Sequence, residues 1–316
     1  MAAQSGSTRV IYAALLGNLL IALTKFTAAL VTGSSVMLSE GIHSVVDTGN
    51  EMLLLYGLHR SARPPDENHP LGHGREIYFW SFVVALLVFA AGAGLSFYEG
   101  IAHILRPEPA RNIMVNYIVI GISALFEGVA WSMALRHFRR EKGKLGYLTA
   151  VRRSKDPTVF TVLFEDTAAL LGLLIAFVAI TAAELLEMPQ LDGLGSMGIG
   201  VVLATTAIFL ARECKGLLIG EQALPSVRRR ISEIASEDPG VVRVNDILTV
   251  HLGPDDIIAT LSIEFRDELT TPLLETCVLR IEKKIIAELP QVSSVFVRPQ
   301  APLDLRQESP LNLNET

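Results

Sequence analysis

Six apolar segments dominate this sequence, and each is long enough to cross a lipid bilayer. A membrane-spanning helix needs about 20 mainly apolar residues. Half of all residues are hydrophobic and the mean hydropathy is +0.41, which is high for a soluble protein of 316 residues. We therefore predict an α-helical membrane protein with six transmembrane helices. The predicted spans lie near residues 10–31, 36–58, 77–95, 113–135, 159–185 and 194–210.

Basic residues are concentrated in alternate loops between these segments. The loop between the second and third spans contains Arg60, Arg63 and Arg75, and the loop between the fourth and fifth contains eight Arg or Lys residues. The loops on the other side contain only Arg106 and Arg111. The positive-inside rule then places both termini and the two basic loops in the cytoplasm. In a bacterial source, this membrane is the inner membrane.

The composition changes after residue 215, where long apolar runs end. Residues 225–236 predict a helix, 241–250 and 257–265 two strands, 272–289 an amphipathic helix and 292–297 a last strand. We therefore predict three parts: a transmembrane transport domain over 1–215, a small α+β cytoplasmic domain over 216–300 and a disordered tail over 301–316.

Ionisable residues interrupt the second and fifth spans. His43 and Asp47 are four residues apart, a spacing that puts both side chains on one face of a helix. Glu165 and Asp166 lie in the fifth span. Ionisable residues inside a membrane usually mark an ion path, and imidazole with carboxylate suits zinc and its neighbours. A polar contact between helices is the alternative, but four ionisable groups are more than packing requires.

A second candidate metal site lies in the loop before the third span. Asp66, His69 and His73 have the spacing of three ligands on one irregular turn, although loop histidines are often merely solvated. Lys25 and Glu127 each stand alone in an apolar run. We predict that Lys25, near the outer end of its span, extends to the membrane interface, and we leave the role of Glu127 open.

Several runs of the sequence resemble the cation diffusion facilitator family, and the resemblance covers nearly the whole chain. The residues that carry it are SEGIHSVVD in the second span, NHPLGHGRE in the following loop, YEGIAHILRPEP after the third span and ALPSVRRRI at the start of the soluble domain. The combination of HxxxD with GHG is specific. The stretch LFEDTAALLG looks most like the branch of the family that contains zinc transporter nine.

The resemblance implies six spans, a ferredoxin-like cytoplasmic domain that dimerises, and a central metal site with two residues from span two and two from span five. His43 and Asp47 match that pattern. Span five departs from it, because Val162 stands where the family has a histidine four residues before Asp166. Alignment by the downstream apolar run makes Asp166 the ligand.

Counting from Pro157 instead makes Glu165 the ligand. Adjacent residues on a helix point about 100° apart, so the two do not bind one ion equally, and we favour Asp166. The loop site carries over as the three residues already named. The soluble domain departs more, since Asn245 replaces the histidine of a His-Asp pair and His251 stands alone. We therefore predict a dimerisation domain that binds little or no metal.

These observations predict a homodimer that exports divalent metal ions from the cytoplasm in exchange for protons, by alternating access. Zn²⁺ is the first candidate, although His with carboxylates also permits Cd²⁺, Co²⁺, Mn²⁺ or Fe²⁺. An unperturbed imidazole titrates near pH 6.5, which suits His43 to proton exchange. The alternative is a membrane-bound metal sensor or regulatory protein without transport. The sequence contains no HExxH motif, and we predict neither an enzyme nor a nucleic-acid partner.

Overall fold

The computed structural model describes residues 18–108, 112–143 and 145–300. The chain forms two compact units, Met1–Leu218 and Ile219–Thr316. The start of the predicted first span and the predicted tail over 301–316 lie outside the described residues.

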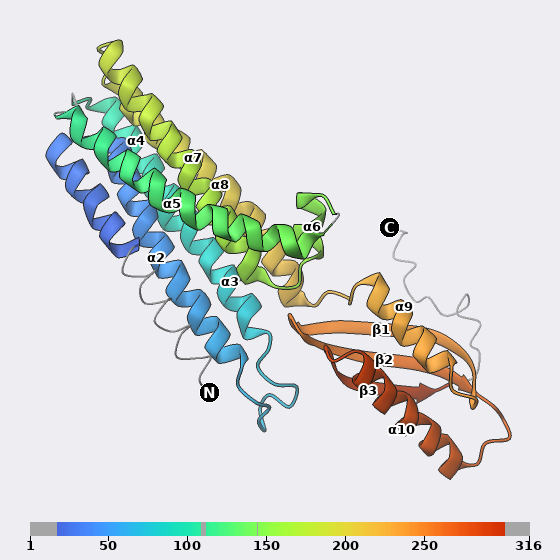
Figure 1. Cartoon of the computed structure of the whole chain (residues 1–316). Coiled ribbons are helices and arrows are strands. Elements are labelled where there is room, and N and C mark those ends of the chain that lie inside the picture. Colours follow the sequence, from blue (N-terminus) through green and yellow to red (C-terminus); the bar gives the residue numbers. More distant parts are fainter. Residues whose placement is uncertain (1–17, 109–111, 144, 301–316) are drawn as a thin grey trace, which may run out of the picture. The chain divides into compact units, whose positions relative to one another are not determined.

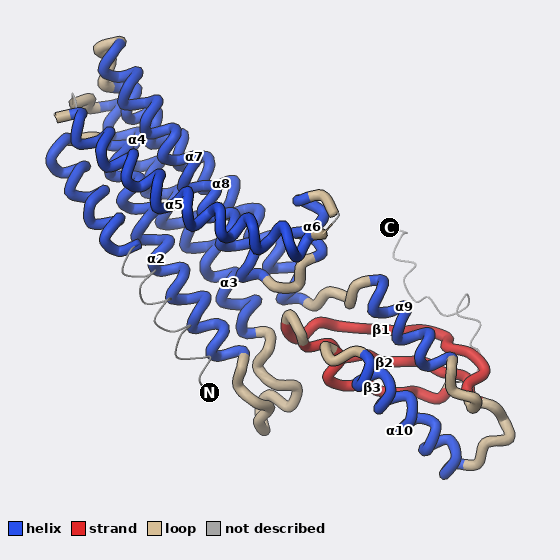
Figure 2. The backbone as a smooth tube through the Cα atoms, in the orientation of Figure 1, coloured by secondary structure: helices blue, strands red, loops and turns tan. Residues whose placement is uncertain are grey.

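The first unit is a bundle of helices (Figures 1 and 2). The described part of each predicted span falls on a helix. The third long helix consists of three segments that follow one another without a break: α3, the π-helical segment η1, and α4. The helices are Asn18–Thr32, α2 Ser35–Ser61, α3 Glu76–Leu87, η1 Val88–Ala93, α4 Gly94–Leu105, α5 Ile113–Lys142, α6 Tyr147–Arg153, α7 Pro157–Leu185 and α8 Gln190–Ile219.

Four helices of the described residues are long and apolar enough to cross a membrane: Glu76–Leu105, Ile113–Arg140, Pro157–Leu185 and Gln190–Ile219. The described part of the first helix is too short to do so. The helix α2 is continuous, but ionisable residues interrupt its apolar sequence. The predicted helical membrane protein with several spans is therefore confirmed, while the count of six stays a prediction. The third and sixth helices are longer than their apolar runs, because polar residues continue each helix beyond the run.

Large apolar side chains cover the surface of this bundle. On α5 the exposed ones recur every three or four residues, so they form one stripe along the helix. Water would make such a stripe costly, whereas lipid tails do not. The stripe consists of Met114, Ile118, Ile122, Leu125, Phe126, Val129 and Met133.

A tight turn joins the first helix to α2. Gly33 has φ of 71°, a left-handed conformation that glycine adopts without strain. Ser34 caps α2 by accepting a hydrogen bond from the Met37 amide. Asp192, from α8, accepts hydrogen bonds from the amides of Ser35 and Val36. The carboxylate thus satisfies the first amides of α2, where the helix dipole also favours negative charge.

The loop between α5 and α7 was predicted only as a basic connection. It contains the short helix α6, which the hydropathy pattern did not indicate because only two turns separate its ends. Tyr147 of α6 stacks on the buried Phe138 of α5, and its hydroxyl accepts a hydrogen bond from Arg139. Aromatic packing therefore holds α6 against α5.

The second unit is a small α+β domain, and it confirms the predicted order of elements. Its sheet has the order β1-β2-β3, with β1 and β2 antiparallel and β2 and β3 parallel. The elements are α9 Pro225–Ser236, β1 Val241–Gly253, β2 Asp256–Phe265, α10 Thr271–Glu288 and β3 Val292–Pro299. The assignment to the ferredoxin-like folds stays a prediction.

One face of this sheet is covered by both helices. Every second residue of β2 is fully buried against them, as the period of a strand requires. Figure 2 shows α9 and α10 on the same face. The core combines Ile231 and Ile234 of α9 with Ile281 and Ile285 of α10, over Ile257, Ala259, Leu261 and Ile263 of β2.

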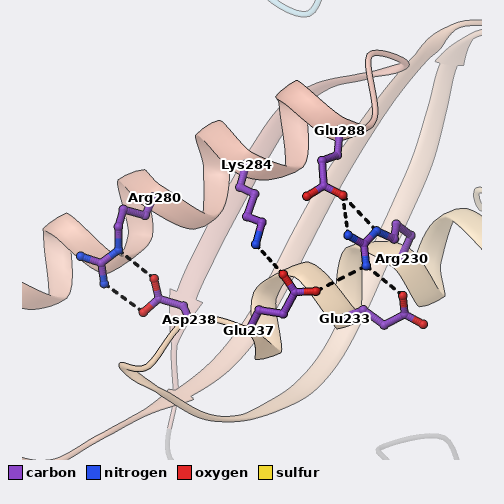
Figure 3. A network of polar contacts seen from close by, with 7 residues as sticks. All are labelled: Arg230, Glu233, Glu237, Asp238, Arg280, Lys284 and Glu288. Atoms are coloured by element: carbon purple, nitrogen blue, oxygen red, sulfur yellow. Dashed lines mark hydrogen bonds and ion pairs between the residues drawn. The ribbon is translucent and has the colours of Figure 1, made fainter.

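Ion pairs join the exposed edges of α9 and α10 (Figure 3). Arg230 of α9 pairs with Glu288 of α10, and Arg280 of α10 pairs with Asp238 beyond α9. Lys284 pairs with Glu237 and holds the pKa of that carboxyl below its usual range. Exposed pairs contribute little each, about 0–1 kcal/mol, so the apolar core provides most of the stability of this domain.

Candidate metal centre

His43 and Asp47 meet one turn apart on α2. His43 is 1% exposed, and its Nδ1 lies 3.2 Å from Asp47 Oδ1 without the angles of a hydrogen bond. Among the described residues, neither ring nitrogen of His43 nor Asp47 Oδ1 has a hydrogen-bond partner. A buried polar atom without a partner costs about 1–3 kcal/mol, so a fold retains such atoms where another function needs them.

The two candidates on α7 differ in how they are satisfied. Glu165 is buried, and its Oε1 accepts a hydrogen bond from Asn50 Nδ2 at 2.8 Å. Asp166 Oδ2 is buried and has no hydrogen-bond partner within the described part of the chain. Asp47 lies within electrostatic reach of both carboxylates. The free oxygen therefore supports Asp166 as the ligand, and the assignment stays a prediction.

The structure does not bring three of these four central residues together at ligand distance. In the described ranges, the one group of three whose ligand atoms all lie within 4.8 Å of one another is the loop group. The central residues come from two different helices, α2 and α7. A cation held by three of them therefore requires the side chains to move toward one another.

Two further carboxylates lie on the same stripe of α2. Glu40 and Glu51 stand three residues before His43 and four after Asp47, so all four share one helix face. Glu51 Oε1 accepts a hydrogen bond from Asn18, while its Oε2 is buried without a partner in the part of the chain that the structure describes. The spacing was visible in the sequence, but the prediction did not count these two as site residues.

The prediction that Lys25 extends to the membrane interface is wrong. Lys25 is 0% exposed, and its Nζ donates to Glu40 Oε2 at 2.9 Å, Ser44 Oγ at 2.9 Å and Glu127 Oε1 at 2.8 Å. Two carboxylates compensate the buried ammonium, so the interface offers no advantage. Glu127 lies 102 residues away in the sequence, and no local pattern indicates that pairing.

The loop residues form a compact cluster. Asp66 Oδ2 lies 2.9 Å from His73 Nε2, and its Oδ1 lies 3.2 Å from His69 Nδ1. Asp66 Oδ1 also accepts hydrogen bonds from the amides of Asn68 and His69, which fixes the turn. The hydrogen bond with His73, followed by the one from the His69 amide, holds the pKa of Asp66 well below its usual range.

This cluster has the chemistry of a zinc site with an open position. Two imidazoles and one carboxylate provide three ligands, and a fourth position of a tetrahedron is left for water or another group. His73 is largely buried, whereas Asp66 and His69 are exposed. A cation from solvent can therefore reach the cluster without any change in the helices.

The soluble domain holds His251 in a structural contact. The side chain is buried in β1, and its Nδ1 lies 3.0 Å from the carbonyl oxygen of Gly253. Asn245 donates a hydrogen bond to the carbonyl oxygen of Gln300. Both side chains therefore have roles within the fold, and the expectation that this domain binds little or no metal stays a prediction.

The sequence is similar to known metal transporters over most of its length. The proton-coupled zinc antiporter SLC30A9, mitochondrial, of Mus musculus is 33% identical over 268 residues, which are 84% of this chain and 47% of the relative. The same antiporter of Xenopus laevis is 34% identical over 85% of this chain and 48% of the relative. The chain thus spans about half the length of these relatives. The cation-efflux pump FieF of Cronobacter sakazakii is 28% identical over 90% of this chain and 89% of the pump.

A solved structure of the MamM CTD in a manganese form is 25% identical, covers 24% of this chain and 96% of that structure, and has a TM-score of 0.23. The family model for the cation efflux transmembrane domain matches residues 11–219, which include the central residues and the loop cluster. With two thirds of its length matched by this model, the chain belongs to the cation efflux family.

Proposed function

We propose that this protein exports a divalent cation, with Zn²⁺ as the first candidate, from the cytoplasm in exchange for protons. The observation that carries the proposal is the set of buried ligand atoms without partners on α2 and α7: both ring nitrogens of His43, Asp47 Oδ1 and Asp166 Oδ2, as judged over the described residues. A bound cation gives a partner to one ring nitrogen of His43 and to the two carboxylate oxygens. The names of the mitochondrial relatives, proton-coupled zinc antiporters, point to the same chemistry.

Proton exchange follows from the ligand types. Imidazole and carboxylate bind a metal only when they are deprotonated, so each bound ion displaces protons from His43, Asp47 and Asp166. Protons that enter from the opposite side compete for the same atoms and release the ion. Alternation of access between the two sides then couples the two flows without any additional group.

The loop cluster has a separate role in this proposal. Asp66, His69 and His73 hold a second divalent ion at the cytoplasmic side, where the exposed Asp66 and His69 face the ion supply. Asn50 keeps Glu165 beside the central site, where that carboxylate adds negative charge.

The remaining parts of the proposal concern assembly and membrane. Six spans, with both termini in the cytoplasm, agree with the distribution of basic residues. Two copies of the chain assemble through the domain over 216–300. The membrane is the inner membrane in a bacterial source, whereas the SLC30A9 relatives are mitochondrial.

The test is Zn²⁺ uptake into sealed vesicles that contain only this protein, followed with a Zn²⁺-sensitive dye inside. We expect an acidic lumen to drive uptake, because protons leave as the ion enters. A proton ionophore should remove most of that uptake, and protein-free vesicles provide the baseline. Zn²⁺ binding by calorimetry without any flux would contradict transport and favour the metal sensor.

A further inference from the structure

Three charged side chains form a buried group within the helix bundle: Lys25, Glu40 and Glu127, here called the charge triad. Lys25 Nζ lies 2.9 Å from Glu40 Oε2 and 2.8 Å from Glu127 Oε1. Lys25 and Glu40 are 0% exposed and Glu127 is 15% exposed. The first helix, α2 and α5 each contribute one member, so the contact joins three helices.

The charges of the triad do not cancel. One ammonium faces two carboxylates, which leaves one negative charge in excess when all three are ionised. Each carboxylate has one buried oxygen, Glu40 Oε1 and Glu127 Oε2, without a hydrogen-bond partner in the described ranges. The excess charge is therefore not neutralised by hydrogen bonds from the protein.

Glycine on α7 makes room for the triad. A Cβ atom at Gly172 would lie 2.3 Å from Glu40 Oε1, a separation that real atoms do not reach. The unpartnered oxygen of Glu40 thus points to α7, the helix that also carries Asp166. This packing places the Glu40 carboxylate of the triad directly against α7.

The triad acts electrostatically on the central ligands without taking their place. Glu40 and Lys25 both contribute to the electrostatic environment of His43, and Glu127 contributes to that of Asp166. Inside a protein the effective dielectric constant is far lower than in water, so such charges act over longer distances. A cation at the central site experiences the excess negative charge of the triad.

Resting on the proposed function, we propose that Lys25, Glu40 and Glu127 set the charge, and through it the cation affinity, of the central site. The positive charge of Lys25 offsets the charge of one of the two carboxylates, so the triad keeps a single negative charge. That charge attracts a dication twice as strongly as a monovalent cation. The three are positioning residues, because their effect passes through the field at His43 and Asp166.

The test is Zn²⁺ binding by calorimetry to the purified full chain, with His73→Ala in every protein so that the loop cluster does not contribute. Glu127→Gln leaves the triad neutral and should weaken Zn²⁺ binding by about tenfold or more. Adding Lys25→Met restores one excess negative charge and should recover most of the affinity. A merely structural contact predicts no such recovery, since the double variant lacks both contacts.

One control variant and one further test variant keep the outcome clear. Arg140→Gln removes an exposed charge at the end of α5 and should change the affinity less than about twofold. Glu40→Gln tests the same proposal if thermal melting shows that Glu127→Gln does not fold. It should weaken Zn²⁺ binding, and adding Lys25→Met should restore the affinity.

The outcomes separate the two proposals. No Zn²⁺ binding by the folded His73→Ala protein would contradict the proposed function. Binding that is unchanged by Glu127→Gln and Glu40→Gln, or a double variant no better than its single variant, would overturn the charge triad alone.

Discussion

The loop cluster and the proposed central site have the same types of ligand, but the sequence separation between the ligands differs. Asp66, His69 and His73 lie within eight residues, and Asp66 hydrogen-bonds to both histidines. The proposed central site would combine His43 of α2 with Asp166 of α7, from helices that pack together only in the folded bundle. One site is thus formed by a local turn and the other by tertiary packing.

The two sites also differ in whether their ligand atoms already have hydrogen-bond partners. In the loop, a cation competes with hydrogen bonds that the ligands already make to each other. In the helix bundle, His43 and Asp47 keep atoms without partners among the described residues, and the packing of the bundle offsets their cost. Substitutions should therefore affect the central site strongly and the loop cluster moderately, and the following predictions test that difference.

The largest effect should come from Asp47→Ala. The change removes a carboxylate from a dehydrated dication, and an under-neutralised charge in a buried site costs several kcal/mol. We expect the rate of Zn²⁺ uptake into vesicles to fall by about 100-fold or more, since about 1.4 kcal/mol is a factor of ten. Thermal melting should show that the variant still folds.

The matched control is Val45→Ala. Val45 lies on the same helix two residues away, but it is 47% exposed on the apolar surface. Its substitution should leave the uptake rate within about twofold, as surface changes usually do. Wild-type uptake by the folded Asp47→Ala protein would remove α2 from the ion path.

The next effect separates the two carboxylates of α7. Asp166→Asn removes an oxygen that is free to bind a cation, so Zn²⁺ binding should weaken by about tenfold or more. Glu165→Gln keeps an oxygen that can accept the hydrogen bond of Asn50, so binding should weaken by only about threefold. Calorimetry on the two variants provides the comparison. The reverse ranking would show that Glu165 is the ligand and Asp166 its neighbour.

The same contrast explains what the sequence could predict. Apolar runs predicted the helices, and spacings of three or four residues predicted the His43–Asp47 pair and the loop cluster, because each depends on local geometry. The burial of Lys25 and its contact with Glu127 depend on two helices that are 102 residues apart in the sequence. Nor could the sequence decide between Glu165 and Asp166, since the hydrogen bond from Asn50 exists only in the packed bundle.

The smallest effect concerns the loop turn and its dependence on pH. Asp66 Oδ1 accepts hydrogen bonds from the Asn68 and His69 amides at 2.9 and 2.7 Å. Asp66→Ala removes both, and hydrogen exchange of these amides should become about threefold to tenfold faster. Glu67→Ala changes an exposed carboxylate next to Asp66, and it should leave the exchange rates unchanged.

The pH dependence follows from the low pKa of Asp66. A carboxyl whose pKa is lower in the folded state stabilises the turn above its ordinary pKa of 3.8, and the stabilisation is lost only as pH falls through the folded value. After correction for intrinsic exchange rates, protection of the two amides in the wild-type protein should therefore stay constant from pH 8 to pH 5. A loss of protection within that range would mean that Asp66 does not hold the turn, and the loop cluster would then depend on the rest of the fold as the central site does.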